Sequence, residues 1–209
     1  MSEQREQVVV YSDYVCPFCY LGRESLQRYQ ETRETPLEID WHPFDLRSQQ
    51  RRPDGTIDHS VDTGKDEEYF EEAKKGVRRL QEKYDVEMDL EIATDIDSLP
   101  AQIVSYALKE REDYQTWLAF DEAVFEALWT DGEDIGDEDL LVELAAAAGV
   151  DEGEVRSALD DDDLRSTLKE EFLNAKNRGV SGVPTFAYDG YVARGAVPPE
   201  QLKRLVEGN

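Results

Sequence analysis

The sequence predicts an α/β fold in which strands and helices at the two ends of the chain flank a long helical middle. At the amino end, an apolar β-branched run at 8–11 and an alternating run at 37–44 lie on either side of a helical pattern, which gives the order β–α–β. At the carboxyl end, two strand-like runs meet at Asp189-Gly190, a dipeptide typical of a hairpin turn. Between these units, over about 65–178, the apolar spacing is helical.

Each element of the amino-terminal unit has its own local sequence signal. The β-branched run that begins at Val8 is typical of a buried strand. Ser12 and Asp13 then supply polar side chains suited to a turn or a helix cap, and Pro17 stands where the first turn of a helix tolerates proline. The second strand alternates apolar with polar residues, namely Leu37, Ile39 and Trp41 against Glu38, Asp40 and His42.

The middle of the chain follows a polar segment at 49–64, which we interpret as a loop. Asp137 is expected to cap one of the helices that follow, and Gly149 to end it. Pro198-Pro199 opens a final helix after the hairpin. We interpret the apolar stripes as core-facing helix surfaces rather than a cofactor box; they lie at Phe70–Tyr84, Ile103–Leu108, Trp117–Leu128, Leu140–Ala148 and Leu164–Ala175.

The charge balance is strongly acidic. Lys and Arg total 23 against 49 Asp and Glu, a formal net charge of −26. Such a field repels phosphate backbones and anionic lipid surfaces, so we expect neither a nucleic acid nor a membrane as partner. The acidic residues are spread along the chain, as in proteins of salt-accumulating halophiles; an ordinary acidic cytosolic protein is the alternative.

The role of the two cysteines depends on whether the protein works in a reducing or an oxidising cellular compartment. The first seven residues are polar and no run approaches the roughly 18 apolar residues of a membrane span, so we expect a cytoplasmic protein. In a reducing compartment, two cysteines separated by two residues are more often chemical than structural.

Cys16 and Cys19 stand at the predicted junction of strand and helix. A helix amino terminus favours the thiolate, which is the form that attacks a disulfide. Cys19 lies one turn further along, so our hypothesis is that Cys16 is the nucleophile and Cys19 the resolving thiol. Pro17 and Phe18 donate no side-chain hydrogen bond and Asp13 opposes a thiolate, so we expect only mild acidity for Cys16.

Two other interpretations of the cysteines stay open. In the first, the cysteines form half of a structural zinc site; such a site needs two further ligands, and the chain offers only His42 and His59. In the second, the two thiols are near each other by coincidence and are chemically inert. We predict no bound metal.

Proline at the start of a strand weakens sheet pairing, so the presence of Pro184 at this position calls for a structural explanation. A cis Val183–Pro184 bond would expose the backbone of Val183 to an extended substrate while Pro184 packs against the cysteines. The alternative is a trans proline that merely begins an edge strand. We predict Pro17, Phe18, Val183 and Thr185 as substrate-binding residues.

These motifs together resemble the FrnE branch of the DsbA-like family. The matching segments are Asp13–Gly22, Trp41–Leu46, Phe125–Gly136, Gly179–Phe186 and Gly195-Ala196.

The resemblance implies a thioredoxin fold with a large α-helical insertion: a thioredoxin-like domain at 6–64 and 180–209, and an inserted domain at 65–179. It also implies dithiol–disulfide exchange, with Cys16 and Cys19 as the redox pair and Pro184 as the cis-proline.

Two positions depart from the family pattern. Related sequences often have His where this chain has Gln102, and Gln where it has Val197. We expect both in the substrate-facing region, where they would alter substrate preference. His42 matches the family motif, and we interpret it as structural.

The leading function is therefore an oxidoreductase or isomerase that acts on disulfides of proteins or small thiols. It needs no bound cofactor, although glutathione is a candidate redox partner, and we expect a monomer or homodimer. One alternative is a glutathione-dependent enzyme, because 2-hydroxychromene-2-carboxylate isomerases and kappa-class glutathione transferases share the architecture but generally place Ser where Cys16 stands. The other is a chaperone-like binding module.

Overall fold

The structure is a computed structural model that describes residues 5–89 and 95–208. In this part of the chain the elements follow the predicted order of β–α–β, helices and β–β–α. They are β1 (Glu6–Ser12), α1 (Pro17–Glu31), β2 (Leu37–Pro43), α2 (Glu67–Tyr84), α3 (Leu99–Arg111), α4 (Tyr114–Trp129), α5 (Glu138–Ala147), α6 (Glu152–Leu159), α7 (Asp162–Asn177), β3 (Thr185–Tyr188), β4 (Tyr191–Arg194) and α8 (Pro199–Glu207).

The strands form one mixed sheet in the order β2-β1-β3-β4. β1 pairs parallel to β2 and antiparallel to β3, so Val10 lies between Trp41 and Phe186. The β3–β4 hairpin turns at Asp189 and Gly190, which both have positive φ (46° and 82°). Two such residues in succession are the geometry of a type I′ turn, which confirms the hairpin prediction.

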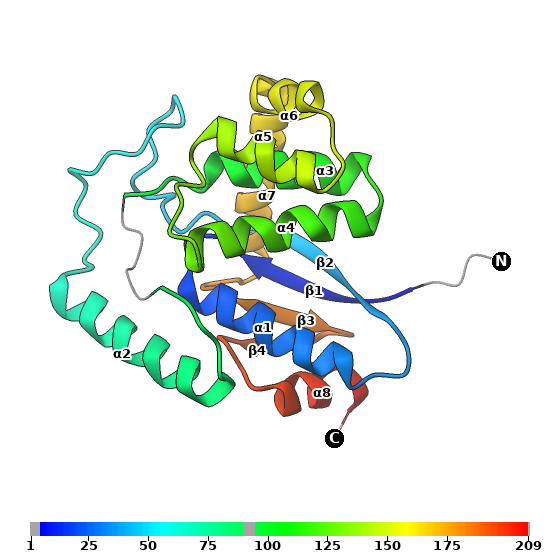
Figure 1. Ribbon diagram of the computed structural model, residues 1–209. Coiled ribbons are helices and arrows are strands. Elements are labelled where there is room, and N and C mark those ends of the chain that lie inside the picture. Colours follow the sequence, from blue (N-terminus) through cyan, green and yellow to red (C-terminus); the bar gives the residue numbers. More distant parts are fainter. Residues whose placement is uncertain (1–4, 90–94, 209) are drawn as a thin grey trace.

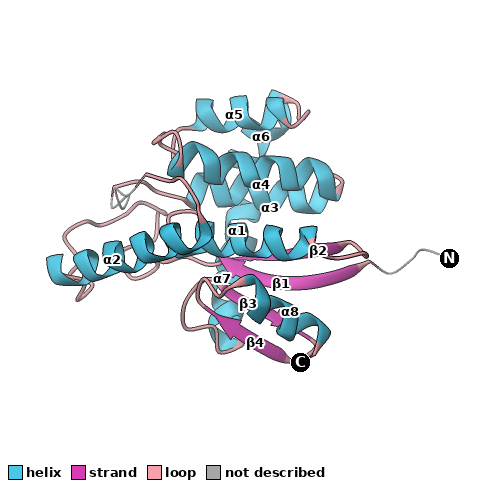
Figure 2. Cartoon of the chain, turned by 60° about the horizontal axis from the view of Figure 1, so that its bottom comes forward, coloured by secondary structure: helices cyan, strands magenta, loops and turns pink. Residues whose placement is uncertain are grey.

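Helices cover both faces of this sheet. α1 and α8 lie together on one face, while α7 packs against β2 on the other (Figures 1 and 2). α3, α4, α5 and α6 form a helical layer beyond the β2 edge. None of the helices in the described ranges is long and apolar enough to cross a membrane.

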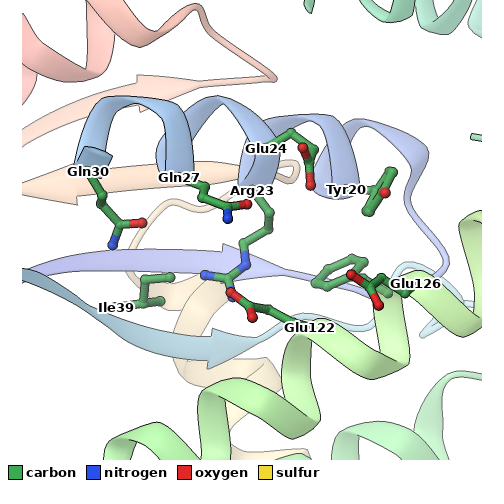
Figure 3. A pocket seen from close by; sticks show the side chains of 9 residues that line it. Tyr20, Arg23, Glu24, Gln27, Gln30, Ile39, Glu122 and Glu126 are labelled. Atoms are coloured by element: carbon green, nitrogen blue, oxygen red, sulfur yellow. The ribbon is translucent and has the colours of Figure 1, made fainter. Parts of the chain in front are cut away.

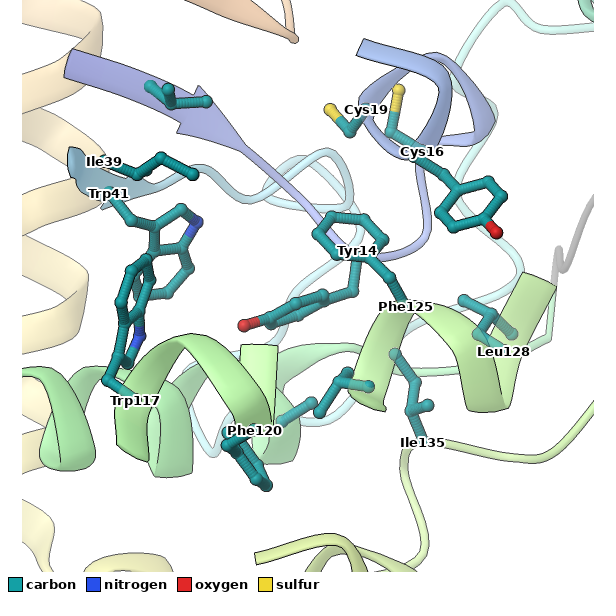
Figure 4. Packing of buried hydrophobic residues seen from close by; sticks show 14 of the residues in the cluster. Tyr14, Cys16, Cys19, Ile39, Trp41, Trp117, Phe120, Phe125, Leu128 and Ile135 are labelled. Atoms are coloured by element: carbon teal, nitrogen blue, oxygen red, sulfur yellow. The ribbon is translucent and has the colours of Figure 1, made fainter. Parts of the chain in front are cut away.

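One aromatic-rich core joins the sheet to the helical layer. Trp41 of β2 lies against Trp117 of α4, with ring centroids 6.4 Å apart, and Tyr14 packs edge-on to Phe125 at 4.7 Å (Figure 4). Both Trp side chains and Tyr14 are almost completely buried. The helical layer therefore shares its core with the sheet.

The capping predictions are partly confirmed. The Asp137 carboxylate accepts a hydrogen bond from the backbone N–H of Asp139 at the start of α5, and Gly149 follows that helix with φ of +92°. By contrast, Cys16 is the N-cap of α1, and no side chain caps that helix. The Ser12 hydroxyl instead accepts from the indole N–H of Trp41, at 2.8 Å.

Candidate redox site

The two cysteines lie at the amino end of α1, where the sequence places them. Cys16 is the N-cap, and its carbonyl accepts the backbone N–H of Cys19 at 2.9 Å. Both cysteines are thiols; Cys16 is 5% exposed and Cys19 is fully buried. Their sulfur atoms lie side by side in Figure 4. Burial, and next the contact with the Cys16 sulfur, raise the pKa of the Cys19 thiol well above its usual value.

The loop before β3 approaches the same helix end. The Val183–Pro184 peptide bond is cis, and the Cys16 thiol lies 3.7 Å from the Val183 carbonyl oxygen, to which it donates. On the helix, Gly22 faces this loop, because a Cβ at Gly22 would lie 3.0 Å from Pro184 Cγ. The structure therefore brings Cys16, Cys19, Val183 and Pro184 together.

A groove of about 680 Å³ opens beside Cys16. Of the predicted substrate-binding residues, Pro17, Phe18 and Val183 line it. Thr185 does not line it, since this side chain is buried and its hydroxyl donates to the Gly182 carbonyl at 2.7 Å. The far wall comes from the segment after β2 and from α2, through Leu46, Arg47, Gln50, His59, Val61, Asp62, Thr63, Lys65, Tyr69, Phe70 and Ala73.

The far wall is the part of the site that the sequence did not reveal. It comes from the predicted loop at 49–64 and from an apolar stripe interpreted as core. Tyr69 and Val61 in this wall are exposed large hydrophobic side chains, and the signal available in the sequence was an aromatic residue, Tyr69, directly beside the apolar stripe and not part of it.

An arginine clasp holds this wall in place. The guanidinium of Arg51 donates to both carboxylate oxygens of Asp45 (2.8 and 3.1 Å) and of Asp97 (both 3.0 Å). It also donates to the Gly55 carbonyl at 2.7 Å. Arg51 thus ties the groove segment to the start of α3 by bidentate, charge-assisted bonds.

A buried carboxylate lies directly behind the cysteine motif. Asp13 has no exposed surface, and its oxygens accept from the Ser98 hydroxyl at 2.6 Å, the Gln102 amide at 3.2 Å and the backbone N–H of Leu46 at 2.9 Å. Burial, and next the charge of Asp45, raise the pKa of Asp13 to about 6, although the hydrogen bonds oppose this shift.

The expected positions of Gln102 and Val197 are wrong. Gln102 is fully buried and donates from its amide nitrogen to Asp13, to the Phe44 carbonyl (3.2 Å) and to the Ser98 hydroxyl (3.1 Å). Val197 is also buried in the core, and its carbonyl accepts from the Ser25 hydroxyl at 2.6 Å. Gln102 supports the site from behind through Asp13, whereas Val197 contacts Ser25 of α1. Helix packing encloses both residues, and the sequence around them does not reveal that burial.

The two histidines lie apart. His59 lines the groove. His42 lies 3.2 Å from the Asp40 carboxylate, and its ring packs 5.1 Å from that of Tyr11. Within 5–89 and 95–208, no three His, Cys, Asp or Glu side chains are grouped to hold a metal ion.

A second, smaller cavity of about 80 Å³ lies between α1 and α4 (Figure 3). Arg23 points into it and pairs with the buried carboxylate of Asp121, while Glu24, Glu122 and Gln27 line the walls. Neither cysteine lines this cavity.

The architecture and the site together define a class of protein. A mixed sheet in the order β2-β1-β3-β4, with two thiols where α1 begins and helices between β2 and β3, is a thioredoxin-like fold that carries additional helices.

The chain belongs to the family of DSBA-like thioredoxin domains, whose model matches residues 7–207. This confirms the predicted family and fold; the FrnE branch stays a prediction. A curated relative, the uncharacterized protein YwbO of Bacillus subtilis (strain 168), is 27% identical over 204 residues, which cover 95% of this chain and 94% of that protein.

Solved structures of this fold include several redox proteins. The probable DsbA oxidoreductase SCO1869 from Streptomyces coelicolor matches with a TM-score of 0.76 and 24% identity, over 95% of this chain and 87% of that one. A 2-hydroxychromene-2-carboxylate isomerase matches at 0.73 and 20%, over 95% and 92%. The cytosolic disulfide reductase DsbM from Pseudomonas aeruginosa, in a structure with GSH, matches at 0.63 and 19%, over 95% and 92%. At these identities the likeness concerns the fold.

Proposed function

We propose that this protein is a thiol–disulfide oxidoreductase that exchanges disulfides with protein or small-thiol substrates through Cys16 and Cys19. The observation that carries the proposal is the placement of Cys16 at the groove, 3.7 Å from the Val183 carbonyl, with Cys19 enclosed behind it. We further propose that it works in the cytoplasm and requires no bound cofactor.

The reaction uses the two sulfurs in sequence. The Cys16 thiolate attacks one sulfur of a substrate disulfide, that bond breaks, and the released substrate thiolate takes up a proton. Cys19 then loses its proton and attacks the Cys16 sulfur, which expels the second substrate thiol. Two electrons and two protons pass from the cysteine pair to the substrate, and the reverse sequence oxidises a substrate dithiol.

The first test uses the two serine variants. We expect insulin reduction to be lost in Cys16→Ser, because the attacking thiolate is gone. Cys19→Ser is the matched control: it should accumulate a mixed disulfide between Cys16 and the substrate, detectable by mass spectrometry. Full insulin reduction by Cys16→Ser would disprove the proposal, and client binding without turnover would favour a chaperone-like module.

A glutathione-dependent isomerase or transferase is the second candidate, because the fold also occurs in a 2-hydroxychromene-2-carboxylate isomerase. Such an enzyme would not require the resolving thiol. Glutathione-dependent turnover that stays complete in Cys19→Ser would favour it. The structure of DsbM with GSH supports glutathione as the small thiol to use first in these assays.

A further inference from the structure

Asp13 contacts the redox pair through its backbone. Its carbonyl accepts the N–H of Cys16 at 3.1 Å, and its own backbone N–H acts to lower the pKa of the Cys19 thiol. Its side chain points the other way, toward Ser98 and Gln102 of α3. The residue therefore joins the cysteine motif to the helical layer, with a carboxylate enclosed between them.

The groups that surround this carboxylate are a mixture of neutral donors and charged side chains of both signs. From α3 it receives only neutral donors, the Ser98 hydroxyl and the Gln102 amide. From the segment after β2 it faces Asp45, which forms an ion pair with Arg51. It also faces Arg47, and the two opposite charges attract each other. After burial and the contact with Cys16, the Asp13 charge also raises the pKa of the Cys19 thiol, because the low local dielectric screens it little.

We propose that the Asp13 carboxylate is a positioning residue for the redox pair: its negative charge, enclosed behind the cysteine motif by α3, disfavours a thiolate and biases the pair toward donating electrons. The inference rests on the proposed function and deepens it by assigning a direction. A nearby anion destabilises the thiolate forms of the reduced pair but not the neutral disulfide. At alkaline pH, where the reduced pair carries a thiolate, the disulfide is thereby favoured and the pair is a better reductant.

The variant Asp13→Asn removes the charge at nearly constant shape. Gln102 can accommodate it, because the Gln102 side-chain oxygen is a buried acceptor with no partner among the described residues. Rotation of that amide would present this oxygen to the new N–H₂ group of the variant. We therefore expect Asp13→Asn to fold.

The test is an equilibrium of the purified protein with reduced and oxidised glutathione, read by alkylation and mass spectrometry. One glutathione disulfide takes two electrons and two protons from the cysteine pair and gives two glutathione molecules. At alkaline pH we expect this equilibrium constant to be at least about tenfold smaller in Asp13→Asn, which is about 30 mV for a two-electron couple. At pH values well below 6 the two proteins should agree, because Asp13 is then protonated.

Two further variants keep the outcome decisive. Asp121→Asn removes another buried carboxylate, bonded to Tyr14 and Arg23, and should leave the equilibrium unchanged. Ser98→Ala removes one donor that offsets the Asp13 charge, so at alkaline pH its equilibrium constant should be larger than that of wild type. Equal constants for wild type and Asp13→Asn at every pH would overturn the inference; if Asp13→Asn does not fold, an unchanged constant in Ser98→Ala at alkaline pH would do so. A Cys16–Cys19 pair that never oxidises would instead refute the proposed function.

Discussion

Gly22 shows at the scale of one residue how the helix and the proline loop fit together. It lies inside α1, where glycine costs about 1 kcal/mol relative to alanine. A Cβ there would lie 3.0 Å from Pro184 Cγ and 3.1 Å from Phe186 Cζ, closer than carbon atoms pack, which is about 3.5–4 Å. The missing side chain is what lets the proline loop reach the cysteine motif.

We expect Gly22→Ala to lower the free energy of unfolding by up to about 2 kcal/mol, since an overpacking cost of about 1–3 kcal/mol outweighs the gain of about 1 kcal/mol in helix propensity. Pro184 and Val183 must move away from Cys16, so insulin reduction should fall as well. Denaturant titration and the insulin assay check the two effects. A variant more stable than wild type with full activity would contradict this reading.

Asp13 has a consequence for stability as well as for redox chemistry. Its folded pKa of about 6 lies above the value of about 4 for an aspartate in an unfolded chain. The folded state therefore binds this proton more tightly, and stability from this group is present below about pH 4 and lost as the pH rises through 6. The loss is roughly 3 kcal/mol.

Subtracting the unfolding free energies of Asp13→Asn from those of wild type, measured from pH 4 to pH 8, should reveal this decline. Asp40→Asn is the control. Hydrogen bonding with His42, and next the bond to Lys109, hold the pKa of Asp40 below its usual range, so its contribution stays constant from pH 4 to pH 8 and is lost only as the pH falls below about 4. A flat difference for Asp13→Asn would rule out the raised pKa.

At the scale of elements, α2 is the wall that completes the groove. It packs on α1 through a small cluster of Leu21, Val77 and Tyr84, and the Tyr84 hydroxyl donates to the Ala196 carbonyl at 2.8 Å. Within α2, Gly76 faces Phe18, the residue between Pro17 and Cys19. A Cβ at Gly76 would lie 3.3 Å from Phe18 Cζ, a contact that a small rotation of the ring can relieve.

We therefore expect Gly76→Ala to differ from Gly22→Ala in sign. The helix gains up to about 1 kcal/mol, while the Phe18 ring shifts toward the groove and changes KM for protein substrates more than kcat. Thermal unfolding and steady-state kinetics measure these effects. Destabilisation as large as that of Gly22→Ala would show that the Phe18 ring cannot yield.

Elements governed by local chemistry are predictable from this sequence. The hairpin follows from Asp189-Gly190, and the α5 cap from Asp137. The helix α6 lies in a segment where no stripe was predicted, because only Val155, Ala158 and Leu159 of its eight residues are buried. The groove wall and the burial of Gln102 depend on contacts between distant segments, which periodicity does not encode.

At the scale of the whole molecule, the net charge of −26 is the dominant feature. Self-repulsion of that size opposes the compact state and is screened by salt. We expect the midpoint of thermal unfolding to rise as KCl increases from about 0.1 M, where the Debye length is about 10 Å, to about 1 M, where it is about 3 Å. Calorimetry with a sucrose control at matched water activity checks this expectation, and a falling midpoint would refute it.

The Arg51 clasp has a consequence for which clients can react. Because it fastens the segment beside Cys16 to Asp45 on one side and to Asp97 on the other, that wall of the groove is held in place. A substrate of the proposed reaction has to bring its sulfur–sulfur bond past this wall to reach Cys16. We therefore expect a loose stretch of chain, or a molecule of tripeptide size, to react faster than a folded globule, so that substrates are distinguished by local unfolding rather than by sequence.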